Sequence, residues 1–161
     1  MNVVVVFGIL AVALFVSAFI TRRRFGLLGL ALAAGSILSG IWSYDAGLMV
    51  GSTGLFPTGP LTTAATLSVI VLLPAVVLLF HGTTYKNTAG QVIGSLLFTL
   101  LALAFLVEPL GYALTLEGVG ADVYRWLADN KETIIGLGLI LAVTDLFFSK
   151  PAHLLERKGK H

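Results

Sequence analysis

The stretch QVIGSLLFTLLALAFLVEPL, residues 91–110, decides the fold of this protein, because it is apolar almost throughout and carries one charge, Glu108. A helix needs roughly 20 consecutive apolar residues to cross the hydrocarbon core of a bilayer. This run therefore predicts a membrane-spanning helix. Glu108 and Pro109 lie near its C-terminal end, where the proline removes one helical hydrogen bond.

The composition of the whole chain points to the same environment. Its 161 residues are 57% hydrophobic and 11% charged, whereas an average soluble domain is about 25% charged. So few polar side chains cannot cover an apolar core, and we expect lipid to surround most of the surface. There is no cysteine, which excludes disulfides, thiolate metal ligands and thiol nucleophiles. Residues 1–161 are interpreted as one integral membrane domain.

Several further segments resemble the first in length and apolar character. The predicted spans cover residues 3–20, 25–42, 61–80, 91–110 and 133–148. Positive charge follows the first span, in TRRRF, and does not precede it, so we expect a retained anchor and not a cleaved signal peptide. The predicted fold class is all-α, a polytopic membrane helix bundle with five transmembrane helices.

The distribution of Lys and Arg predicts the orientation. With the N-terminus outside, eight of the ten basic residues fall on the inner side, in segments 21–24 and 81–90 and in the basic cytoplasmic tail 149–161. Short loops rich in Lys and Arg remain in the cytoplasm. We therefore expect an N-out, C-in protein of a prokaryotic cytoplasmic membrane, with its tail drawn to anionic lipid headgroups.

The two predicted outer loops differ in character. Residues 44–60 carry one charge and are apolar for a loop, so contact with the lipid headgroups is expected. In GVGADVYRWLADN, residues 118–130, apolar side chains recur at helical spacing, and Tyr and Trp favour the membrane interface. This second loop predicts a short helix lying on the outer surface, separate from the fifth span.

Small residues are expected to bring the helices together, because lipid offers no hydrophobic reason for helices to associate. Several recur at steps of three and four, which places them on one helical face. These candidate packing residues are Gly29, Ala33, Ser36, Gly40, Gly90, Gly94, Gly138 and Ala142. The spacing fits packing within the bundle and also contact with a second copy or a partner. Pro74 and Pro109 are predicted helix kinks.

Glu108 and Asp145 are carboxylates within predicted spans, which makes each a candidate site. Glu108 lies near the outer end of the fourth span and Asp145 near the inner end of the fifth. The rise per residue then separates them by roughly 20 Å, too far for a catalytic pair. Each is interpreted as a structural contact or as a proton or cation site. Lys86 and Arg22–Arg24 are the expected partners of Asp145.

The sequence contains no pattern of an enzyme. The three histidines lack metal-ligand spacing, and phosphate-binding, dinucleotide-binding and nucleophile motifs are missing. We therefore expect no catalytic residue, metal, cofactor or nucleic-acid partner. The leading hypothesis is a non-enzymatic membrane scaffold or accessory subunit that binds other membrane protein subunits or itself. The alternative is an oligomeric channel or ion-coupled transporter that uses the intramembrane carboxylates.

Two resemblances concern the order of the spans. The stretches TRRRFGLLGLALAAGSILSGIW, residues 21–42, and TAGQVIGSLLFTLL, residues 88–101, resemble the colicin V production protein family, which is described with four spans. The five-span, N-out layout is similar to small membrane subunits of respiratory proton pumps, although the third span lacks their tyrosine-bearing irregular helix. Neither resemblance assigns a functional residue.

Overall fold

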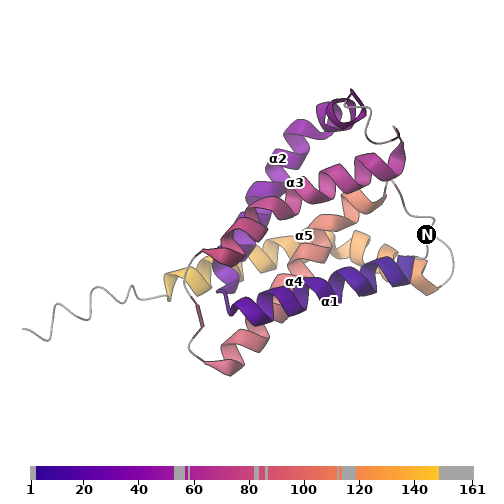
Figure 1. The fold of residues 1–161 in the computed structure, drawn as a ribbon. Coiled ribbons are helices and arrows are strands. Elements are labelled where there is room, and N and C mark those ends of the chain that lie inside the picture. Colours follow the sequence, from indigo (N-terminus) through magenta and orange to yellow (C-terminus); the bar gives the residue numbers. More distant parts are fainter. Residues whose placement is uncertain are drawn as a thin grey trace, which may run out of the picture.

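The computed structural model describes residues 3–52, 57, 59–81, 84–85, 87–111, 113 and 119–148. Within these ranges every named element is a helix, and the only sheet-type pairing is an isolated bridge between Arg23 and Thr84. The predicted all-α class is therefore confirmed. The helices are α1 (Val3–Thr21), α2 (Phe25–Ser52), α3 (Pro60–Phe80), α4 (Thr88–Gly111) and α5 (Val119–Phe147) (Figure 1).

Three helical segments are long and apolar enough to cross a membrane. They are Phe25–Asp45, Pro60–Phe80 and Thr88–Gly111, and Val5–Thr21 is a shorter apolar helix. Large apolar side chains are exposed along all of these segments, as expected where lipid and not water is the solvent. Length and composition thus indicate a membrane protein.

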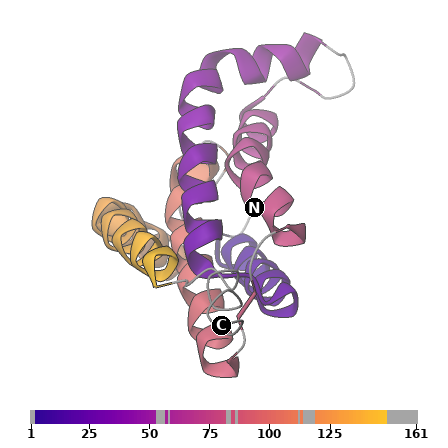
Figure 2. The same cartoon turned by 90° about the vertical axis from the view of Figure 1, so that its left-hand side faces the viewer.

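The second helix is longer than predicted. We expected a span ending at residue 42 and a loop from residue 44, but α2 continues to Ser52, so that part of the prediction is wrong. Figure 2 shows the last turns of α2 bending away from the axis of its first part. The Ser43 hydroxyl donates to the carbonyl of Gly40 at 3.1 Å; glycines and hydroxyls bonded in this way favour helix bending. Residues 53–56 and 58 lie outside the described part of that loop.

The separate interfacial helix is also a wrong prediction. Its residues form the first turns of α5, which runs without a break from Val119 to Phe147 and includes most of the predicted fifth span. No glycine or proline occurs between residues 121 and 135, so nothing local ends the helix there. The Asn130 side-chain amide donates to the carbonyl of Trp126 at 2.8 Å, just before the expected junction.

The centre of the bundle is α4, which packs against all four other helices. Its buried Phe98, Leu101 and Leu106 meet Leu28 and Leu32 of α2 in the main core. Figure 2 shows α5, in orange and yellow, at one side of the bundle. Helices α3 and α4 continue through Pro74 and Pro109. The core therefore positions α2, α3 and α4 as neighbours, and polar groups gather where these helices end or separate.

The tightest backbone approach is at Gly35, which was not among the predicted packing residues. A Cβ atom at this position would overlap the carbonyl oxygen of Val71 on α3. Of the predicted set, Gly29 lies against Ala142 of α5, and Gly138 lies against Leu101 of α4. Gly40 has open space where a Cβ would be. The small residues thus serve different interfaces and do not form one continuous seam.

Candidate functional site

The side chain of Asp145, a residue of α5, lies against the N-terminus of α2. Its Oδ2 accepts a hydrogen bond from the Gly26 N–H at 2.9 Å and another from the Tyr85 hydroxyl at 3.3 Å. The Tyr85 hydroxyl itself accepts from the Phe25 N–H at 3.1 Å. The first N–H groups of a helix have no partner within the helix and form its positive end. A carboxylate from α5 and a phenol from the α3–α4 connection therefore cap α2.

Tyr85 is held in place from several sides. Its N–H donates to the carbonyl of Arg22 at 2.8 Å, and the Arg24 guanidinium lies 5.7 Å from its ring centre. A Cβ at Gly94 would come within 2.6 Å of the ring, and one at Gly90 within 3.2 Å. Gly90 and Gly94, predicted as helix-packing residues, therefore make room for this aromatic ring.

Further contacts at the same end of the bundle involve α1 and α3. Arg23 donates from its guanidinium to the carbonyls of Leu79 and Phe80, both at 2.8 Å, at the C-terminal end of α3. Such carbonyls lack helical donors, so a cation there is favourable. The Gln91 amide donates to the carbonyl of Phe19 at 2.6 Å. Together with Asp145, these contacts tie all five helices together at one end. Lys86, an expected partner of Asp145, lies outside the described residues.

Burial raises the pKa of the Tyr85 phenol above 10.0, and the negative charge of Asp145 adds to the rise, while the bond from the Phe25 N–H opposes it. The folded state therefore favours the neutral phenol. That contribution to stability is fully present below pH 10 and is lost as the pH rises through the pKa of the folded state. We expect the unfolding midpoint in detergent to fall above pH 10, and to fall less in Tyr85→Phe. Equal pH profiles for the two proteins would contradict this assignment.

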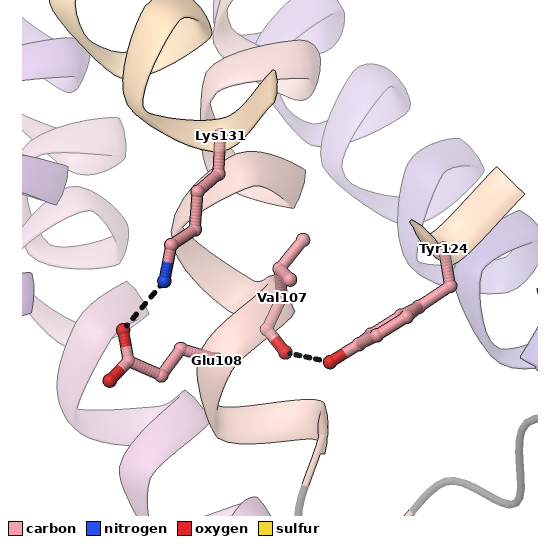
Figure 3. Close-up of polar contacts among 4 residues, drawn as sticks. All are labelled: Val107, Glu108, Tyr124 and Lys131. Atoms are coloured by element: carbon pink, nitrogen blue, oxygen red, sulfur yellow. Dashed lines mark hydrogen bonds and ion pairs between the residues drawn. The ribbon is translucent and has the colours of Figure 1, made fainter. Parts of the chain in front are cut away.

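Glu108 belongs to the opposite end of the bundle. Its Oε2 lies 3.4 Å from the Lys131 Nζ of α5, and the Tyr124 hydroxyl donates to the carbonyl of Val107 at 2.9 Å (Figure 3). The Glu108 side chain is 74% exposed and that of Lys131 34%. Figure 3 shows both contacts joining α4 to the first half of α5. Glu108 and Asp145 thus belong to separate groups of contacts at opposite ends of the bundle.

The ion pair of Glu108 and Lys131 is expected to add little to stability. Exposed pairs of this kind contribute under about 1 kcal/mol, because both charges remain well solvated. Lys131→Met should therefore change the free energy of unfolding by less than about 1 kcal/mol, measured by denaturant titration in mixed micelles. A larger loss would show that the pair holds α4 and α5 together.

A polar cavity of about 250 Å³ opens beside Glu108, between α2, α3 and α4. Its lining consists of Ser36, Ser39, Gly40, Ser43, Val71, Phe105, Glu108 and Pro109. Ser36 and Gly40 were predicted as helix-packing residues, with no predicted contact to Glu108. Ser39 and Ser43 were not predicted as site residues, although three serines at steps of three and four on one span form a detectable polar face.

Ser39 is unusual among the hydroxyl side chains of these helices. Most donate to a carbonyl three or four residues earlier, as Ser68, Ser95 and Thr99 do at 2.7–2.8 Å. Ser39 is only 7% exposed, yet its hydroxyl has no hydrogen-bond partner among the described residues. Because Ser39 lines the cavity, that unused hydroxyl is available to whatever occupies it.

No group of three or more His, Asp and Glu side chains is placed to hold a metal ion within the described ranges. Comparison with known proteins finds no match for this chain among family models, curated proteins or solved structures. The two resemblances in span order therefore support no family assignment, and function has to be argued from the geometry of the two sites.

Proposed function

We propose that the chain is an integral protein of a prokaryotic cytoplasmic membrane, crossing it five times with the N-terminus outside. Three apolar segments of sufficient length support this, and α1, with 19 residues, measures about 28 Å at the helical rise. The apolar part of α5 is shorter and would require local thinning of the bilayer. Arginines at one end of the bundle and acidic residues near the other favour N-out and C-in.

Within that membrane, we propose a non-enzymatic scaffold or accessory subunit. One observation carries the proposal: α1 and α5 each present an outward glycine with open space around it. No described residue beyond their own helical turns comes within 4 Å of where a Cβ would lie at Gly8 or Gly136, and large apolar side chains such as Ile9 and Leu137 are exposed beside them. Exposed glycines allow a second helix to approach closely in lipid. Other membrane protein subunits or a second copy would supply that helix.

The test is the native mass of the protein extracted in mild detergent. We expect a complex with another membrane protein or with itself, and we expect Gly136→Ile to weaken it by obstructing helix approach. Leu137→Ile, at the neighbouring and also exposed position on the same helix, serves as the matched control and should leave the complex intact. Free monomers alone, with no co-purifying protein, would refute the scaffold role.

The polar cavity favours a second candidate, an oligomeric channel or ion-coupled transporter. A carboxylate and several hydroxyls line one hollow between spanning helices, and such residues mark ion pathways in membrane proteins. Reconstituted vesicles would then show cation or proton flux that falls in Glu108→Gln. Flux that is unchanged in both Glu108→Gln and Asp145→Asn would dismiss this candidate.

A further inference from the structure

We propose that the cavity beside Glu108 is a binding site for one small, partly hydrated monovalent cation. The proposal rests on the lining of the cavity and requires neither the scaffold role nor transport. Among the described residues of the lining, Glu108 supplies the only formal charge, and three serines supply hydroxyl oxygens. Carboxylate and hydroxyl oxygens are hard ligands of the kind that alkali cations accept.

The backbone adds further negative potential at the same place. Glu108 lies in the last turn of α4, which ends at Gly111, and the C-terminal end of a helix carries partial negative charge. Pro109 has no N–H, so the carbonyl of Phe105 lacks its usual helical donor. Both Phe105 and Pro109 line the cavity. A cation is therefore favoured there over an anion or a neutral solute.

The depth and size of the cavity define the ligand further. Ser36 and Val71 lie near the middle of the segments Phe25–Asp45 and Pro60–Phe80, so the hollow reaches inward from the end of α4. A volume of about 250 Å³ holds roughly eight waters at about 30 Å³ each, enough for an ion with part of its hydration shell. Calcium sites usually supply more than one carboxylate, and the carboxylate here already faces the Lys131 ammonium, which points to a singly charged ion.

Two residues give the site its specific chemistry. Ser39 is only 7% exposed, and its hydroxyl has no hydrogen-bond partner among the described residues, so it remains accessible in the cavity to a bound ion or its water. The Lys131 ammonium already lies 3.4 Å from Glu108. It is a resident positive charge that a cation has to compete with. Removing that ammonium should therefore strengthen binding, whereas removing the Glu108 charge should weaken it.

The experiment measures ²²Na⁺ binding to the detergent-purified full chain, with choline chloride keeping the ionic strength constant. We expect saturable binding. Glu108→Gln should weaken it by about tenfold or more, and Ser39→Ala by about two- to tenfold, following the usual strengths of charged and neutral hydrogen bonds. Lys131→Met should tighten it. Ser68→Ala is the matched control, because its hydroxyl bonds to the carbonyl of Ala64 outside the cavity.

Each variant is first checked for wild-type helix content and elution volume. If Glu108→Gln fails this check, Ser39→Ala and Lys131→Met still test the site, because their expected effects have opposite signs. Binding that does not saturate in the wild type would overturn the proposal. So would equal affinity in wild type, Ser39→Ala and Lys131→Met. The outcome is independent of native mass, so failure of the scaffold role and failure of this site are distinguishable.

Discussion

Replacing Gly35 by alanine is expected to lower the free energy of unfolding by about 1–3 kcal/mol, the usual cost of adding atoms to a well-packed contact. The added Cβ would overlap the carbonyl oxygen of Val71. A backbone atom cannot rotate away as a side chain can, so α2 and α3 would have to separate. This loss should exceed the gain in helix propensity, which is up to about 1 kcal/mol for Gly→Ala.

Gly40→Ala is the matched control for this prediction, because it makes the same change on the same helix. No atom lies within 4 Å of the Cβ position at Gly40, so its effect should stay within about 0.5 kcal/mol or be slightly stabilising. Both variants would be unfolded by SDS in mixed micelles, with helix content followed by circular dichroism. Equal stabilities would show that α2 and α3 are not in close backbone contact.

Replacing Asp145 by alanine is expected to cost about 1–2 kcal/mol, close to the upper range for loss of a helix cap. The change leaves the Gly26 N–H without its side-chain acceptor and removes the carboxylate to which the Tyr85 hydroxyl donates. Asp145→Asn keeps an acceptor oxygen but loses the negative charge that complements the α2 N-terminus. It should therefore have an intermediate effect.

Thr144→Ala controls for substitution at this end of α5, because among the described residues that exposed hydroxyl bonds within its own helix, to the carbonyl of Ile140 at 2.8 Å. A double-mutant cycle of Asp145→Ala with Tyr85→Phe should give a coupling energy of about 0.5 kcal/mol or more, since the two side chains act on the same N-terminus. Strict additivity of the two substitutions would mean that Asp145 and Tyr85 cap α2 independently.

The helices themselves could largely be predicted from the sequence. α1, α3 and α4 begin and end within three residues of the predicted segments 3–20, 61–80 and 91–110, because a long apolar run in lipid must satisfy its backbone within one helix. The two wrong predictions, the end of α2 and the separate interfacial helix, concern segments that are not long apolar runs. Residues 44–52 and 121–132 are less uniformly apolar, and α2 and α5 nevertheless continue through them.

The sites were harder to predict, because contact between distant segments leaves no periodic signal. The expected cation partners of Asp145 did not include the N–H of Gly26 or the hydroxyl of Tyr85, both of which it contacts across the sequence. Gly90 and Gly94 were interpreted as a helix-packing motif, and they accommodate the Tyr85 ring. Spacing correctly identified these glycines as places of close approach but could not identify what approaches them.

The sequence alone indicated a lipid environment and identified the helical segments. Apolar runs of membrane length form helices because an unpaired backbone group is costly in lipid. The tertiary structure alone decided which side chains share a site. Ser39 becomes a candidate ligand only because α2, α3 and α4 meet beside Glu108. Helical periodicity places a residue on a face, whereas the packing of large and small side chains determines which other helix that face meets.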